Sequence, residues 1–190
     1  IRNRGHGDAD RYNGRLKLEK SAVLIYPDSR LRTVSQVVTT FDTSLTNLVA
    51  ELDHHLHSGP PSVGIAAPQI GRFFRVVIVD VSAMFDAGRK RKPKGTNHGR
   101  LVLINPVIAE RSGEVVGREG CLSVPDYTGN VARADAITLV AQDHTGEQRK
   151  FKLSGFEARA AQHEVDHLDG ILFLDRVVSP RQVFRRKNYK

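Results

Sequence analysis

The sequence has a single cysteine, Cys121, and a lone cysteine cannot form a disulfide within the chain. It fits a reducing compartment, where one thiol is either an inert core residue or a functional one. No apolar run approaches the length of about 18 residues that a membrane-spanning helix needs, so we expect no membrane partner. The start lacks the charged region, apolar stretch and small-residue cleavage site of a secretion signal. We therefore expect a cytoplasmic protein, with an organelle interior as the alternative.

Repeats and low-complexity tracts are also absent, and the hydrophobic fraction of 39% is too high for disorder. A chain of 190 residues is long enough for one domain with its own core. We predict a flexible arm over residues 1–20, a single domain over 21–180 and a short basic tail over 181–190. The formal charge of +8 indicates an acidic partner such as RNA or the ribosome surface, although simple solubility explains it equally well.

Hydrophobic spacing predicts two helices. Residues 42–59 carry apolar side chains at helical spacing, with several polar residues at the start to cap the helix and Gly59 to end it. The second helix begins after Ser154, where Glu157 three positions later completes a capping-box pattern. It ends at Gly170 and is apolar over most of its circumference, so we expect it to be buried.

Runs of apolar and β-branched residues predict four strands, at 73–82, 101–108, 136–143 and 148–154. The last two flank HTGE, which is a hairpin signal. The basic segment 86–99 has no periodicity and is predicted to be a solvated loop, with RNA contact as the alternative. The expected fold is α+β, a single domain in which antiparallel strands wrap around the second helix.

That helix carries the stretch QHEVDH, residues 162–167, which places His163 and His167 four residues apart. Positions four apart lie on one face of a helix, so both rings can reach one metal ion. Such an H-E-x-x-H pattern arises by chance in roughly one chain of this composition in a hundred. Two histidines hydrogen-bonded within a core remain the alternative, but Glu164 beside the first ring favours a metal.

A catalytic metal takes three protein ligands and leaves one position open for water. After His167 the chain has no further His, Glu or Cys, and only Asp169 and Asp175 could serve from that side. A thiolate is a good ligand for zinc or iron, so the upstream candidate is Cys121. The alternative is that this lone cysteine is a small buried hydrophobe.

Three motifs in this order resemble the signatures of the peptide deformylase family: SVGIAAPQIG at 62–71, EGCLSVP at 119–125 and QHEVDHLDG at 162–170. The similarity runs from about Val23 to about Pro180. It implies a hydrolase that removes the formyl group from the N-formylmethionine of nascent polypeptides and releases formate. N-formylmethionyl peptides are then the expected substrates. The ribosome surface is an expected partner, and we expect a monomer.

The resemblance implies that Cys121, His163 and His167 bind a metal. That metal is Fe(II) in the native enzyme, and Zn, Ni or Co are substitutes. Glu164 matches the catalytic carboxylate of the family. It directly follows a ligand, so it can reach the metal's water as a base and later protonate the leaving amine.

Two further motif positions match groups that hold the formyl oxygen, namely the side chain of Gln69 and the backbone N–H of Leu122. An amide donor and a backbone donor together can stabilise a developing oxyanion. Gly64 matches the glycine beside the bound peptide. The methionine side chain is expected in an apolar cleft formed by Val63, Ile65 and Phe156.

Other positions either support the helix or depart from the family pattern. Asp166 faces away from the metal side, and the resemblance pairs it with Arg133 in a buried ion pair, with a solvated surface pair as the alternative. Glu119 is a further supporting group. Ser62 stands where the family has a glycine. Arg159 stands one turn before His163, where relatives tend to be apolar, and is expected at the rim of the substrate pocket.

Two other functions fit parts of the sequence. A metalloprotease or other zinc hydrolase could use the same helix with a downstream ligand. A basic RNA- or ribosome-binding module could carry an incidental histidine pair, and it predicts RNA binding with steep salt dependence and no hydrolysis.

Overall fold

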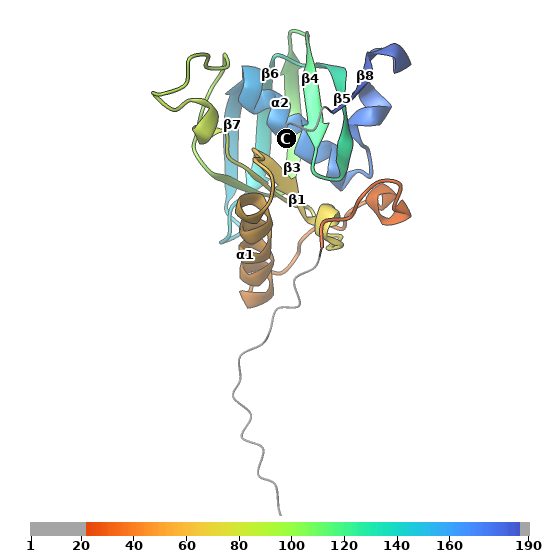
Figure 1. Cartoon of the computed structure of the whole chain (residues 1–190). Helices are drawn as coiled ribbons and strands as arrows, with labels where there is room; N and C mark the ends of the chain where they lie inside the picture. Colours follow the sequence, from red (N-terminus) through yellow and green to blue (C-terminus); the bar gives the residue numbers. More distant parts are fainter. Residues whose placement is uncertain (1–21, 187–190) are drawn as a thin grey trace, which may run out of the picture.

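Within residues 22–186, the part of the chain that the structure describes, two antiparallel sheets hold one helix between them. This computed structural model orders the strands β1-β2-β3-β6-β7 in one sheet and β4-β5-β8 in the other (Figure 1). The first sheet consists of β1 (Gly64–Ala66), β2 (Val76–Val79), β3 (Leu101–Ser112), β6 (Ala136–Gln142) and β7 (Gln148–Ser154). The second consists of β4 (Val115–Cys121), β5 (Val124–Arg133) and β8 (Val183–Arg185). The two α-helices are α1 (Thr43–Ser58) and α2 (Gly155–Leu168).

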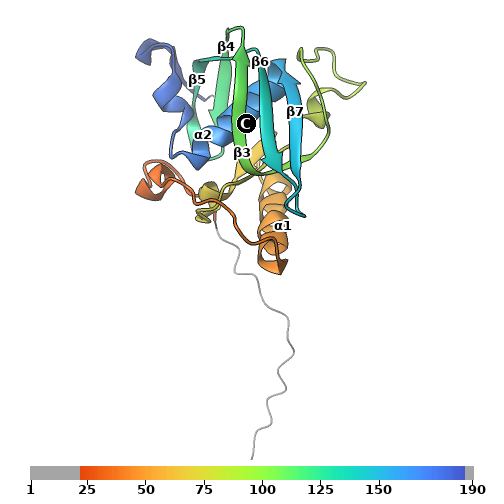
Figure 2. The same ribbon diagram turned by 180° about the vertical axis from the view of Figure 1, so that it is seen from behind.

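The helix α2 is buried because it lies between the two sheets. It packs against β1, β2, β6 and β7 of the first sheet, and Figure 2 shows β3, β6 and β7 crossing in front of it. Ala158 and Ala161 on this helix are completely buried, and their small side chains let the sheet approach closely. The prediction of a central, buried second helix is confirmed.

The helix α1 covers the opposite face of the first sheet. Its N-terminus is capped by Asp42, whose carboxylate accepts hydrogen bonds from the first turn, the nearest at 2.8 Å. The buried leucines of α1 pack with Val76 and Ile78, whereas Val77 and Val79 pack with α2. Because helices cover both faces of β2, every residue of that strand is buried, as a continuous apolar run predicts.

The capping box predicted at the start of α2 is wrong. The side chain of Ser154 makes no capping hydrogen bond. Glu157 turns instead to the loop at 86–99, where it accepts hydrogen bonds from the hydroxyl of Thr96 and, at 2.8 Å, from the backbone N–H of His98. The carboxylate of Glu157 is completely buried, so it needs these partners. This contact fastens the loop to the first turn of the helix that carries the histidines.

The predicted hairpin at 136–143 and 148–154 is confirmed as β6 and β7. The strand predicted at 73–82 is shorter, because Phe73 and Arg75 exchange backbone hydrogen bonds of 2.8 Å with Gln36 rather than with a neighbouring strand of the sheet.

The strand predicted at 101–108 is longer, and β3 passes through Pro106 to Ser112. A β-bulge beside Pro106 accommodates the proline, which has no backbone N–H to donate to the neighbouring strand. Asn105 adopts a positive φ of 51° at this bulge. The predicted C-terminal end of α2 is confirmed by Gly170, which adopts a φ of 68°.

The α+β architecture matches the expectation of antiparallel strands around a central helix. The expected arm at 1–20 and the final residues 187–190 of the expected tail lie outside the described residues, while 183–185 form β8. Among the helices of residues 22–186, none has the length and apolar character needed to cross a bilayer.

Candidate metal centre and active site

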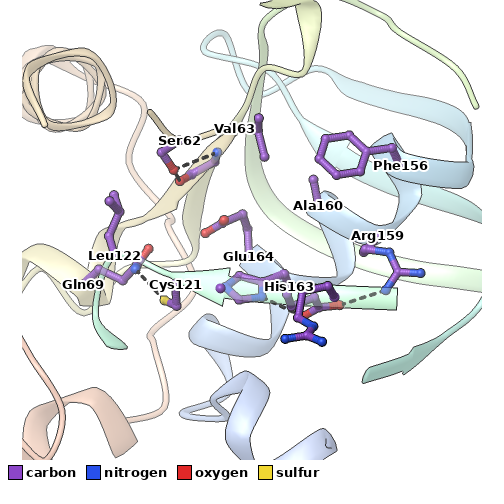
Figure 3. A pocket seen from close by; sticks show the side chains of 14 residues that line it. Ser62, Val63, Gln69, Cys121, Leu122, Phe156, Arg159, Ala160, His163 and Glu164 are labelled. Atoms are coloured by element: carbon purple, nitrogen blue, oxygen red, sulfur yellow. Dashed lines mark hydrogen bonds and ion pairs between the residues drawn. The ribbon is translucent and has the colours of Figure 1, made fainter. Parts of the chain in front are cut away.

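The strand β4 and the helix α2 face each other along matching rows of side chains. Glu119 and Cys121 alternate toward α2, while His163 and His167 project from one face of the helix, one turn apart. Figure 3 shows Cys121 of β4 and His163 of α2 at the same cavity. Cys121 Sγ lies 3.2 Å from Nε2 of His167, and Oε2 of Glu119 lies 2.9 Å from Nδ1 of His163. The sheet and the helix therefore bring residues 46 positions apart into direct contact.

The thiol and the two imidazoles form a set of donors that suits a metal. Each of three residues offers one ligand atom, and these atoms all lie within 4.8 Å of one another: Cys121, His163 and His167. Burial alone would raise the pKa of the Cys121 thiol, but the neighbouring imidazoles hold that pKa well below its ordinary value of 9.0. Thiolate is the form that binds metals, so the chemistry of these donors fits zinc or iron.

The downstream aspartates do not compete for this role. Asp169 pairs with Arg75 at 2.7 Å, and Asp175 pairs with Arg32. Within the described residues, the one group of three or more His, Cys, Asp or Glu side chains that could hold a metal is the one that contains Cys121.

A buried network of charges orients His163. Glu119 accepts two hydrogen bonds from Arg133, at 2.9 and 3.0 Å, and its contact with Nδ1 of His163 leaves the other ring nitrogen for a metal. Arg133 also reaches Asp166 at 2.5 Å, and Arg176 closes the network on the outer side of Asp166. The expected buried pair of Asp166 with Arg133 is thus present. Burial raises the pKa of Glu119, but hydrogen bonds from His163 and Arg133 outweigh it and lower that pKa to about 2.

Glu164 lies beside the ligand atoms without joining them. Its side chain is buried, and Oε2 has no hydrogen-bond partner among the described residues. Burial raises the pKa of Glu164 to about 7, although the imidazoles of His163 and His167 partly oppose that rise. A carboxyl group with this pKa can both accept and release a proton near neutral pH. Gly64 on β1 packs directly against it, since a Cβ there would lie 2.5 Å from Oε1 of Glu164.

Gln69 presents its amide donor to the same place. The backbone N–H of Ala66 donates to Oε1 of Gln69 at 2.9 Å, which fixes the orientation of the amide. Its Nε2 therefore faces Ser123 Oγ at 3.1 Å and Cys121 Sγ at 3.4 Å. A short 3-10 helix at residues 67–70 holds Gln69 in this position, where only 2% of it is exposed.

A cavity of about 140 Å³ opens above these groups. Figure 3 shows Glu164 and Gln69 on one side of it, and Val63, Phe156 and Ala160 toward the other. The lining includes Gly64, Leu122, Ser62 and Arg159 as well, together with Arg118 to Gly120 of β4. The structure does not bring Ile65 to this cavity, because that side chain is completely buried in the core beneath α1.

The cavity lies between two free sheet edges. β1 ends the order of the first sheet and β4 ends that of the second, so each has one side without a neighbouring strand among residues 22–186. Ser62, two residues before β1 begins, donates its hydroxyl to the carbonyl oxygen of Gly64 at 2.9 Å. Free strand edges on both sides of a cavity are suited to pairing with an extended peptide.

Sequence reasoning missed several groups here. Ser123 lies within the EGCLSVP motif, and its contact with Gln69 could have been suspected from the motif alone. Nothing in the sequence indicated Arg176, which reaches Asp166 from the segment after α2. Arg118 also lines the cavity, but its position on a strand was not predicted.

Comparison with known proteins identifies the family. The family described as Polypeptide deformylase matches residues 20–183. A peptide deformylase from Thermodesulfovibrio yellowstonii is 35% identical over 85% of this chain and 92% of its own, and peptide deformylase 1 of Bacillus subtilis is 40% identical over 82% and 88%.

Solved structures agree with this match. A peptide deformylase from Legionella pneumophila aligns with a TM-score of 0.72 and 36% identity over 84% of this chain and 86% of that one. The enzyme from Thermotoga maritima aligns with a TM-score of 0.73 and 31% identity over 84% and 98%. The likeness in sequence and in fold extends over the whole region that builds the cavity, and the chain therefore belongs to the polypeptide deformylase family.

Proposed function

We propose that this protein hydrolyses the formyl amide of polypeptides that begin with N-formylmethionine. Water is added across the C–N bond, formate is released and the methionine keeps a free amino group. The observation that supports this proposal is that Cys121, His163 and His167 lie close together beside the buried carboxylate of Glu164. The family to which the chain belongs is named for this reaction.

Cys121, His163 and His167 would hold a metal ion in this site. When bound, the metal would supply Lewis acidity that polarises the formyl carbonyl and makes water acidic enough to lose a proton near neutral pH. We propose Fe(II) as the native metal, with Zn, Ni or Co as substitutes. Anaerobic purification with metal analysis tests this assignment. If aerobic, zinc-loaded protein is as active as anaerobic iron protein, the assignment to iron is wrong.

Glu164 is proposed to move the proton. Its pKa of about 7 allows the carboxylate to take a proton from the attacking water and then to give it to the amine nitrogen as the C–N bond breaks. The close packing of Gly64 against this side chain keeps the carboxylate beside the reacting carbon. A base that is held in place in this way needs no rearrangement between its two roles.

Gln69 and the backbone N–H of Leu122 are proposed to hold the formyl oxygen. Both lie at the cavity, and the amide orientation of Gln69 directs its N–H donors inward. Hydrogen-bond donors fixed in a water-poor site stabilise negative charge on an oxygen more strongly than water does. Leu122 directly follows Cys121 at the end of β4 and lines the cavity, which supports a role for its main chain.

The peptide is proposed to lie between the free edges of β1 and β4, with Gly64 beside its main chain. Val63 and Phe156 would then enclose the methionine side chain, together with Ala160. Burying an apolar side chain of this size contributes about 1.5–3 kcal/mol, which orients the formyl carbon toward Glu164.

The remaining proposals concern the setting of the enzyme. We propose a monomer that acts in the cytoplasm on nascent chains, near the ribosome surface. The net charge of +8 supports attraction to ribosomal RNA. Salt-dependent sedimentation of the protein with ribosomes tests this partner, and analytical ultracentrifugation tests the oligomeric state.

The release of formate from formyl-Met-Ala-Ser tests the function itself. Activity that follows metal content and disappears with Cys121→Ser supports the proposal. A Cys121→Ser variant with unchanged metal affinity would favour another zinc hydrolase. Binding of RNA without any hydrolysis would favour the RNA-binding module.

A further inference from the structure

The row of side chains on α2 that holds the metal ligands continues one turn further to Arg159. This residue lines the cavity, and its side chain is 11% exposed. Gly117 lies opposite on β4, two residues before Glu119 in the alternating row that faces the helix. A Cβ on Gly117 would collide with Cζ and both Nη atoms of Arg159. The missing side chain at Gly117 is therefore what makes room for the guanidinium.

The guanidinium of Arg159 makes only long hydrogen bonds, although its side chain is well buried. Its hydrogen bonds to the carbonyl oxygens of Val131 and Val115 are both 3.4 Å long. It lies 3.7 Å from Glu119, a carboxylate that Arg133 already binds through two shorter hydrogen bonds. A guanidinium has five N–H donors, so it can accept a further partner from inside the cavity.

We propose that Arg159 lets the side-chain pocket accept a first residue with a hydrogen-bond acceptor at its end. Formyl peptides that begin with methionine sulfoxide would then be substrates alongside those that begin with methionine. This inference rests on the proposed deformylase function. It adds a substrate class and makes Arg159 the residue that determines it.

Methionine sulfoxide fits this pocket better than the other acceptors do. It has the length of methionine and differs from it by one oxygen on the sulfur, so Val63, Phe156 and Ala160 can enclose the rest of the side chain in the same way. In a purely apolar pocket its oxygen would lose the hydrogen bonds of water without compensation. An anionic side chain would be repelled by the carboxylates of Glu119 and Glu164 in the cavity lining, whereas a sulfoxide has no net charge and its oxygen can accept hydrogen bonds from Arg159.

The test compares kcat/KM for formyl-Met-Ala-Ser with that for each sulfoxide epimer of the same peptide. We expect Arg159→Leu to lower the ratio of sulfoxide to thioether activity by at least about tenfold, as expected for the loss of a hydrogen bond to a charged group. Arg149→Leu is the matched control, since Arg149 lies on β7 and pairs with Asp143. We expect it to leave the ratio unchanged.

A second variant and a second measurement keep the inference open to refutation. Gly117→Ala displaces the guanidinium without removing it and should lower the same ratio, even if Arg159→Leu folds poorly. Calorimetry with the product peptides Met-Ala-Ser and Met(O)-Ala-Ser measures binding without hydrolysis. Both variants should lower the ratio of sulfoxide to thioether affinity as they lower the ratio of activities. Ratios that change less than about tenfold in both variants overturn the role of Arg159. Failure to cleave formyl-Met-Ala-Ser refutes the proposed function instead, and the binding ratio then decides the inference alone.

Discussion

The substitution Gly64→Ala places a methyl group against the carboxylate of Glu164, which we propose moves the proton. The new Cβ would lie 2.5 Å from Oε1 of Glu164 and 2.8 Å from its Cγ and Cδ. The backbone of Gly64 does not have a positive φ, so alanine itself introduces no backbone strain. The perturbation therefore acts on the position of Glu164.

The size of the effect follows from these contacts. Ordinary van der Waals contact begins near 3.4 Å, so the side chain of Glu164 must move by roughly 0.6–0.9 Å. A misplacement of about 1 Å at a reacting centre can reduce the rate about 100-fold. We therefore expect kcat to fall by about two orders of magnitude, with little change in stability, since a side chain rather than the backbone yields.

The assay is the release of formate from formyl-Met-Ala-Ser, with metal content and the thermal midpoint measured on the same sample. Gly88→Ala is the control, because nothing lies within 4 Å of a Cβ at that position. A Gly64→Ala enzyme that retains its metal and turns over within about threefold of wild type would refute the argument that the position of Glu164 limits the rate.

Three further predictions follow from the buried charges. Glu164→Gln should keep the metal and lose about 10²–10⁴-fold in kcat, and an activity close to wild type would remove Glu164 from the mechanism. Arg133→Met should lower the free energy of unfolding by about 3–5 kcal/mol in urea denaturation, because buried Glu119 loses both short hydrogen bonds from a guanidinium and keeps only that of Arg159 at 3.7 Å. Arg176→Met is its control and should cost about 1 kcal/mol or less, since that side chain is 43% exposed. Because the pKa of Glu119 is about 2 in the folded protein against an ordinary 4.5, its contribution to stability is complete above pH 4.5 and is lost as the pH falls toward 2. Glu119→Gln should therefore show a smaller loss of unfolding free energy than wild type between pH 5 and pH 3, and equal losses would contradict the assignment.

The helices and the hairpin could be predicted because their residues follow one clear period. The apolar positions of α1 repeat at helical spacing, and the residues of β6 and β7 flank an evident turn. β4 and β5 were not predicted, because VVGREGC and VPDYTGNVAR contain the glycines and charges that usually mark loops. In this protein those residues serve the site, with Glu119 binding His163 and Cys121 facing His167.

The candidate ligands could be proposed from spacing and from the motifs, but their supporting groups depend on tertiary contacts. The capping pattern at Ser154 was misleading because the carboxylate of Glu157 accepts its hydrogen bonds from the loop at 86–99 instead. Ile65 was expected at the substrate, yet β1 directs it into the core while its neighbour Gly64 faces Glu164. Only the strand register decides which neighbouring residue reaches the cavity.

The most direct test of the central claim is the ratio of kcat/KM for formyl-Met-Ala-Ser to that for acetyl-Met-Ala-Ser. A formyl carbon carries only hydrogen, so we expect it to fit between Glu164, Gln69 and the main chain at Leu122, whereas an acetyl methyl group would crowd those groups. We predict a preference of at least about 100-fold for the formyl peptide, as expected for a misplacement near 1 Å. Comparable values for the two peptides would contradict the proposed deformylase activity and favour a general metallohydrolase.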